Sequence, residues 1–292
     1  GKLLQVLLRG DFLILHGLSV WLSVTAIRES CYIYAVTVLK IMLNYIERFN
    51  INRRHLMRHH LRGLLGIVFA VLLIFITFVT SFEAVTYWTP NFYRDEFEHY
   101  QVLEDMQAWM GDEMTMDDLC DVMHQTMVYL RGDRENLIVE TTINGGTTEF
   151  YNENEKSHMA DVRQLFVICL VVRALAILSC IAIAGFLVVV AGPRGALGYL
   201  SRGFIRACLL ILGVVAIIAF LAMIDFTRVF TVFHEIFFSQ GNWLFDPRES
   251  RMINMLPEGF FSDCALRIAA TFVGAMLALL TASGLAQHFM KS

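Results

Sequence analysis

The stretch LLGIVFAVLLIFITFVTSF, residues 64–82, contains no charged side chain and lies between Arg62 and Glu83. A bilayer core about 30 Å thick needs about 20 apolar residues at 1.5 Å each. A surface helix of a soluble protein would show a polar stripe at helical period, and this stretch shows none. The stretch therefore predicts a helix that spans a membrane.

Three further runs have the same character, namely 165–191, 207–224 and 268–286, and Arg173 is the sole charge inside them. Charged residues make up 17% of the chain, apolar residues 57%, and the mean hydropathy is +0.57. Soluble proteins carry about 25% charge, so the deficit comes from these long uncharged runs. We expect an all-α membrane protein whose core is a four-helix transmembrane bundle.

Lys and Arg in short loops mark the cytoplasmic side of a membrane protein. Basic residues gather before the first run (52–62), between the second and third (Arg194, Arg202 and Arg206) and near the C-terminus (Lys291). The loop 84–162 is the opposite, with 17 Asp and Glu against four Lys and Arg. We therefore expect a multi-pass protein of the cell membrane with both termini in the cytoplasm and with loops 84–162 and 225–263 outside it.

These features divide the chain into six parts. Residues 1–61 form an N-terminal extension that we expect to be peripheral or not part of the core fold, although an interfacial helix pair is the alternative. The others are the first span (62–83), an extracytoplasmic cap (84–162), the second and third spans with a short cytoplasmic loop (163–224), an extracytoplasmic interfacial segment (225–263), and the fourth span with a cytoplasmic tail (264–292).

The cap carries signals for both helix and strand. Residues 92–109 and 116–130 have helical periodicity, and Asp112 or Thr115 is a candidate N-cap for the second helix. Ile, Val and Thr flank the sequence Asn-Gly-Gly at 144–146, which is typical of a tight hairpin turn because such a turn needs positive φ. The cap should be a small α+β unit on the outer face of the bundle.

Two segments beside the membrane each hold one histidine. His158 lies in FYNENEKSHMADVR (150–163), which enters the second span, and His234 lies in FTVFHEIFFSQGNWLFDP (230–247), which follows the third. The topology places both at the same outer surface. If 155–163 is helical, Glu155 and Asp161 share a face with His158, where a carboxylate could fix the imidazole tautomer. The alternatives are a solvated histidine among capping acids and, for His234, a packed aromatic belt.

Arg173 lies about ten residues below the outer surface, where a charge is by default a functional-site hypothesis. Its candidate partners are Glu83 and Asp225, at the outer ends of the first and third spans, and a structural ion pair is as plausible as a substrate contact. The six cysteines form no zinc spacing, and His234 lacks the second histidine of H-E-x-x-H, so no zinc protease is indicated.

Taken together, the two histidine segments resemble the lipoprotein intramolecular transacylase family of Gram-positive bacteria. The resemblance rests on Phe150-Tyr-Asn-Glu-x-Glu-x-x-His158-Met-x-Asp161, on Phe233-His234-x-Ile-Phe-Phe followed by Trp243 and Asp246-Pro, and on Leu256-Pro-Glu-x-Phe-Phe-x-Asp263. It covers the chain from about residue 64 to the C-terminus, and it includes the four spans, the outward loop and the order of the motifs.

The resemblance implies an acyltransferase that moves an acyl chain from the diacylglyceryl group of a lipoprotein's N-terminal cysteine to the α-amino group of that cysteine. A histidine with a pKa near about 6.5 suits the removal of a proton from an amine at neutral pH. We therefore assign His158 and His234 as the acid/base pair, with either one as the base. Asp161 or Glu155 would orient His158, and Arg173, Trp243 and Asp246 would support the site.

The expected partners are a diacylated lipoprotein N-terminus as substrate and membrane lipid, with no nucleic acid, no metal and no cofactor. Two alternatives remain open from the sequence. One is a membrane protein that binds haem or a metal between His158 and His234, and the other is a non-catalytic membrane partner protein.

Overall fold

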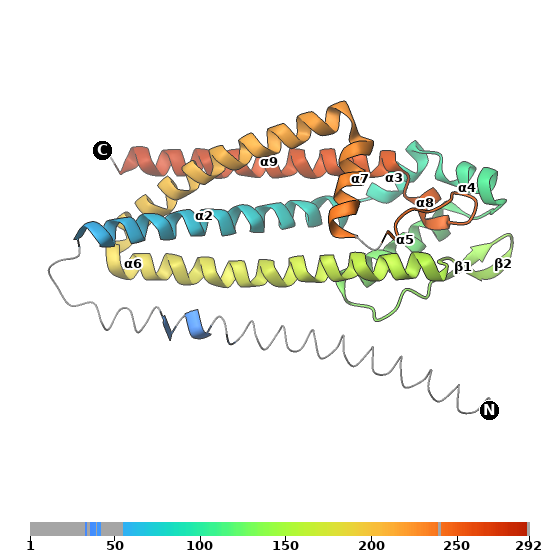
Figure 1. Cartoon of the computed structure of the whole chain (residues 1–292), viewed down its shortest axis with the longest axis horizontal. Helices are drawn as coiled ribbons and strands as arrows, with labels where there is room; N and C mark the ends of the chain where they lie inside the picture. Colours follow the sequence, from blue (N-terminus) through green and yellow to red (C-terminus); the bar gives the residue numbers. More distant parts are fainter. Residues whose placement is uncertain (1–32, 34–35, 39, 42–54, 239–240, 291–292) are drawn as a thin grey trace.

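The computed structural model describes residues 33, 36–38, 40–41, 55–238 and 241–290 of the chain (Figure 1). Most of the N-terminal extension 1–61 therefore lies outside the described residues. Three described helices are long and apolar enough to cross a membrane: α2 (His55–Thr86), α6 (Glu153–Ile224) and α9 (Glu258–Phe289). They lie side by side along the long axis of the molecule.

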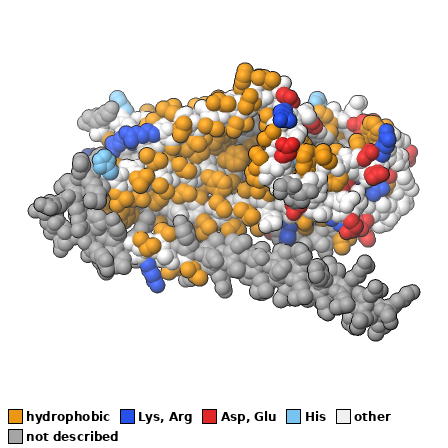
Figure 2. Space-filling view, in the orientation of Figure 1, with side chains coloured by type: hydrophobic (Ala, Val, Ile, Leu, Met, Phe, Trp, Pro, Cys, Tyr) orange, Lys and Arg blue, Asp and Glu red, His pale blue; other side chains and the backbone are white. Residues whose placement is uncertain are grey.

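The outside of this bundle is apolar. Large hydrophobic side chains face outward along its length, with Met223 86%, Val189 74% and Leu210 70% exposed. Figure 2 shows hydrophobic side chains over the middle of the molecule and acidic side chains gathered at the end that α3, α4 and α5 form. An apolar exterior of this extent is stable in lipid and would aggregate in water. The protein is therefore a mostly helical, integral membrane protein.

Helix α6 folds back on itself near its middle. Its 72 residues would span about 108 Å as a straight helix, several times a bilayer core. Gly192 has φ 72° and ψ 167°, a conformation that is essentially restricted to glycine, and Pro193 follows it without a backbone N–H. The two limbs of α6 on either side of Gly192 correspond to the runs 165–191 and 207–224 of the sequence.

The second limb of α6 packs against α2 through glycines. A Cβ atom on Gly203 would lie 2.2 Å from the carbonyl oxygen of Gly66, and one on Gly66 would lie 2.4 Å from that of Tyr199. Only glycine allows backbones to approach this closely. Beside this contact Ala70, Phe204 and Phe272 form a buried cluster with their neighbours.

The cap contains α3 (Phe92–His99), α4 (Val102–Met110), α5 (Met116–Arg131) and a hairpin of β1 (Glu140–Ile143) and β2 (Gly146–Glu149). The predicted hairpin is confirmed: Asn144 and Gly145, with φ of 52° and 75°, make the turn. Thr115 is the N-cap of α5, and its side chain accepts a hydrogen bond from the backbone N–H of Asp118. The single helix expected over 92–109 is wrong, because Gln101 has φ 51° and divides it into α3 and α4.

Two short helices connect the bundle to the cap. Helix α7 (Phe226–Phe237) runs across the cap end of the bundle, nearly perpendicular to the long helices (Figure 1). Helix α8 (Arg251–Met255) lies within the cap, where Met252 and Met255 join its hydrophobic core. The connection from α7 to α8 carries Asn242 and Trp243, so this segment lies where cap and bundle meet.

Candidate active site

The structure brings the two predicted histidines together. The ring centroids of His158 and His234 are 6.2 Å apart and the rings are nearly parallel, at 24°. His158 lies in the second turn of α6 and His234 in the last turn of α7, so the fold-back of α6 makes this meeting possible. Both side chains are buried, with 7% and 9% of their surface exposed.

Aromatic rings enclose the pair. Phe238 and Phe245 lie 4.9 and 5.8 Å from the His158 ring, centroid to centroid. Phe230 and Trp243 lie 4.1 and 4.9 Å from the His234 ring. Trp243, which was predicted to support the site, lies directly against His234. These rings exclude water and leave the imidazoles in an apolar environment.

This environment favours neutral imidazoles. Burial and, to a smaller extent, the positive charge of a protonated His234 lower the pKa of His158 to about 4, although the Asp161 carboxylate and the Asn242 amide act in the opposite direction. Burial also lowers the pKa of His234, partly offset by a hydrogen bond to the carbonyl of Phe230. At neutral pH both rings can therefore accept a proton, and a proton on one discourages a proton on the other.

The hydrogen bond of His234 selects its tautomer. Nδ1 of His234 lies 2.8 Å from the backbone oxygen of Phe230, four residues earlier in α7. A carbonyl oxygen only accepts, so Nδ1 must carry the hydrogen, and the neutral ring then has its lone pair on Nε2. Nε2 is the nitrogen of His234 that can act as a base.

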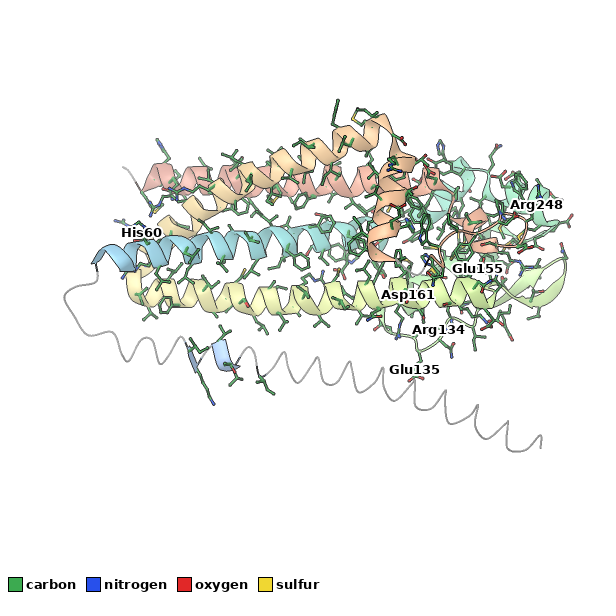
Figure 3. All side chains as sticks on the ribbon, viewed as in Figure 1. His60, Arg134, Glu135, Glu155, Asp161 and Arg248 are labelled. Carbon is green, nitrogen blue, oxygen red and sulfur yellow. The ribbon has the colours of Figure 1, made fainter. Side chains whose placement is uncertain are left out.

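Asp161, which is labelled on α6 in Figure 3, is connected to His158 through Asn242. Nδ2 of Asn242 donates to Oδ2 of Asp161 at 2.9 Å, and the Asn242 side chain adjoins the His158 ring. Asp161 lies one turn after His158 on α6, as the helical spacing predicted. The carboxylate thus acts on the ring through its charge and through the amide.

Glu155 makes its hydrogen bonds away from the histidines. This fully buried carboxylate accepts from the backbone N–H groups of Asn152 and Met252, at 2.7 and 2.8 Å, and from Oγ of Ser250 at 2.6 Å. The first contact completes a capping box at the start of α6, and the others fasten α8 to it. Glu155 therefore holds the segment before α8 in place and does not orient His158 directly.

The remaining predicted residues lie apart from the imidazoles. Arg173 forms an ion pair with the buried Glu83 of α2, one of its two predicted partners, whereas Asp225 instead caps α7 by accepting from the N–H of Arg228 at 2.9 Å. Asp246 accepts from the N–H of Arg248 at 2.9 Å within its own turn. Among the described residues no group of three or more His, Cys, Asp or Glu is placed to hold a metal ion.

Several residues of the site were not selected from the sequence. Asn242, Phe238, Phe245 and Ser250 all lie in the connection around α7 and α8. A lone Asn or Ser in such a segment has no periodic signal, and only the tertiary contact with α6 gives it a role. The nearby Trp243-x-x-Asp246-Pro pattern was the available hint.

The model of the lipoprotein intramolecular transacylase Lit family matches residues 67–261, which include every residue of the site described above. The chain belongs to this family. Lit proteins are acyltransferases that act on lipoproteins, so this protein is a membrane acyltransferase.

Solved structures agree with this assignment at the level of fold. The membrane integral Lit from Bacillus cereus is 21% identical, with a TM-score of 0.61 over 80% of this chain and 99% of that one. Two structures of the same protein with a single histidine replaced, by arginine or by alanine, match with TM-scores of 0.59. No curated protein sequence matches the chain significantly.

Proposed function

We propose that the chain is a Lit enzyme that moves one acyl chain from the glyceryl group of a diacylglyceryl-cysteine to the α-amino group of the same cysteine. The amine nitrogen attacks the ester carbonyl, a C–N bond forms, the C–O bond to glycerol breaks, and one proton passes from nitrogen to the glyceryl oxygen. The close approach of His158 and His234, at 6.2 Å between ring centroids, carries this proposal.

His234 is the base in this scheme. The hydrogen bond from its Nδ1 to Phe230 leaves the Nε2 lone pair available for the proton of the amine, which has a pKa near about 8 in its ammonium form. His158 receives this proton from His234 through one water or one substrate oxygen between the rings, and delivers it to the departing glyceryl oxygen. Its lowered pKa, about 4, makes its protonated form a strong donor to an alkoxide.

No enzyme nucleophile is needed, because donor ester and acceptor amine belong to one molecule. Holding them in line is worth a large part of the barrier, about 7–11 kcal/mol for well-oriented intramolecular reactions. The aromatic enclosure also keeps out water, which would otherwise hydrolyse the ester. This chemistry needs no metal and no cofactor.

The acyl chains reach the histidines from the lipid. In the second limb of α6 every side chain from 216 to 221 is exposed, so no face of the helix packs against the bundle over more than one and a half turns. That segment leads directly into α7 and His234. A diacylated substrate lying in the bilayer can therefore present its ester at the level of α7.

Four crossings complete the proposal: α2, each limb of α6, and α9. The basic residues Arg194 and Arg202 near the fold-back then lie in the cytoplasm, and the cap and histidines lie on the extracytoplasmic side. Both ends of the described bundle, at the start of α2 and the end of α9, face the cytoplasm.

The test is co-expression with a lipoprotein in a host that lacks the activity, followed by mass spectrometry of the lipoprotein N-terminus. The wild-type protein should give an N-acylated lyso-form, and H158A and H234A should leave the α-amine free. The exposed His124 of α5 provides the matched control, H124A, which should remain active. A free amine with wild-type protein, or a Soret band in the purified protein, would contradict the proposal.

A further inference from the structure

Two buried polar atoms at the site have no hydrogen-bond partner within the described part of the chain. One is Nδ1 of His158 and the other is Oδ1 of Asn242. The two side chains are neighbours, and His158 is more than nine-tenths buried. Leaving either group unsatisfied costs about 1–3 kcal/mol, so a pair of such groups side by side requires an explanation.

The hydrogen bond to Asp161 decides which end of the Asn242 amide faces the ring. A carboxylate only accepts, so Asn242 must present its NH₂ group to Asp161, as the 2.9 Å contact records. The amide oxygen is then the atom of Asn242 that remains for His158, whose protonated ring the Asn242 side chain favours. An amide oxygen in this position can accept a hydrogen bond from the ring and has no hydrogen of its own to donate.

Building on the proposed function, we propose that Asn242 is a positioning residue that links Asp161 to His158. Its Oδ1 accepts the Nδ1 hydrogen of His158 when the substrate closes the site, and this fixes the tautomer with the lone pair on Nε2. The same nitrogen, Nε2, is then available on both histidines, because the Phe230 carbonyl imposes that tautomer on His234.

The groups that face His158 support this arrangement. His234 on α7 disfavours a positive charge on the ring, whereas Asp161 on α6 and Asn242 in the connection after α7 favour it. Asn242 can do so by accepting a hydrogen bond from one ring nitrogen. In apo structures such bonds are commonly long and tighten when substrate is bound.

Nuclear magnetic resonance of the full chain, labelled with ¹⁵N-histidine and held in lipid nanodiscs, tests the tautomer. The His158 signals are assigned by their loss in H158Q. In the wild-type protein at neutral pH the hydrogen should reside on Nδ1, and in N242A the two tautomers should become mixed. A hydrogen on Nε2 in the wild type, or the same tautomer in N242A, would overturn the proposal.

The pKa of His158 provides a second test, because two variants of Asn242 should shift it in opposite directions. N242A removes a group that favours the protonated ring and should lower the pKa, whereas N242D adds a negative charge and should raise it. A merely structural role for Asn242 predicts no such pair of opposite shifts.

Turnover of a diacylated lipopeptide should follow the same pattern. N242A should lower kcat about ten- to hundredfold with little change in KM, because the ring is misplaced while substrate binding is kept. The matched control is N254A: Asn254 is a buried residue of α8, and its amide donates to the backbone oxygens of Pro247 and Ser250. N254A should lower stability without altering the His158 tautomer.

These measurements separate the two proposals. A wild-type protein without transacylation would refute the proposed function, whereas the resonance measurement would still decide the role of Asn242. An active wild type whose kcat is unchanged in N242A would refute the positioning role alone.

Discussion

The rings of His158 and His234 approach to 6.2 Å although 75 residues separate them, which include most of α6 and most of α7. The approach depends on Gly192, which turns α6 back, and on α7, which crosses the end of the bundle. The two rings differ in their hydrogen bonds: Nδ1 of His234 donates to the Phe230 carbonyl, whereas Nδ1 of His158 has no partner among the described residues. The two imidazoles are therefore near but not equivalent.

If one proton passes through both rings, the two histidines act as a unit. H158A and H234A should each lower the rate about 10²–10⁴-fold, and the double variant should be little worse than either alone. Single-turnover transacylation of a diacylated lipopeptide measures this. Multiplicative losses in the double variant would mean that the rings act in separate steps.

Stability should fall as the pH is lowered through the histidine range. The folded-state pKa of His158 is about 4 against 6.5 for a free histidine, so between these values the unfolded chain binds more protons and unfolding becomes more favourable. The stabilisation is fully present above about 6.5 and is lost toward pH 4. Thermal unfolding in detergent should show a shallower decline over this window for H158Q, and an identical decline would contradict the burial of a neutral ring.

Much of the fold could be predicted because the bilayer imposes simple requirements. The run 64–82 and its three counterparts fall inside α2, α6 and α9, and the Asn144-Gly145 turn follows from local backbone preference. The break at Gln101 could not be predicted, because nothing in the residue type demands positive φ there and tertiary packing of the cap sets it.

The site was predictable only in part. The approach of His158 and His234 was predicted from their interfacial positions, and Glu83 was one of two partners predicted for Arg173 from membrane depth. The prediction that Glu155 could orient His158 went further than the helical spacing allowed. That spacing places it one turn from His158, but the capping box and α8 take up its carboxylate oxygens.

Arg173 and Glu83 should be coupled in their effect on stability, so that losing one charge costs more than losing both. R173M leaves Glu83, which is 4% exposed, without its counter-charge and should cost about 3–5 kcal/mol. The double variant R173M/E83Q should recover much of this loss, because no uncompensated charge remains. Thermal unfolding of the four members of the cycle checks the prediction, and a double variant as unstable as R173M would show that the charges have another role.

The contact of Gly203 with α2 should tolerate no side chain. In G203A the new Cβ would lie 2.2 Å from the Gly66 oxygen, so the limb must move away from α2 and the buried cluster around Phe204 loses packing. Gly213 in the same limb provides the matched control, since a Cβ there has no atom within 4 Å and G213A should be neutral or stabilising. If G203A is as stable as the wild-type protein, the second limb of α6 does not pack against α2 as described.

The carboxylate of Glu155 should control activity through the segment that it holds. E155A removes the acceptor for Ser250 and Met252, so α8 loses its attachment to α6 and the connection carrying Asn242 and Trp243 is no longer held over the histidines. We expect a loss of stability of about 1–3 kcal/mol from the unsatisfied buried donors and a lower kcat. S250A removes only one of the three contacts and should have a smaller effect in the same direction.

Because the Glu155 carboxylate makes these bonds away from the histidines, E155A should leave the pKa of His158 nearly unchanged. A large shift of that pKa, measured by resonance titration, would instead show that Glu155 acts on the ring directly.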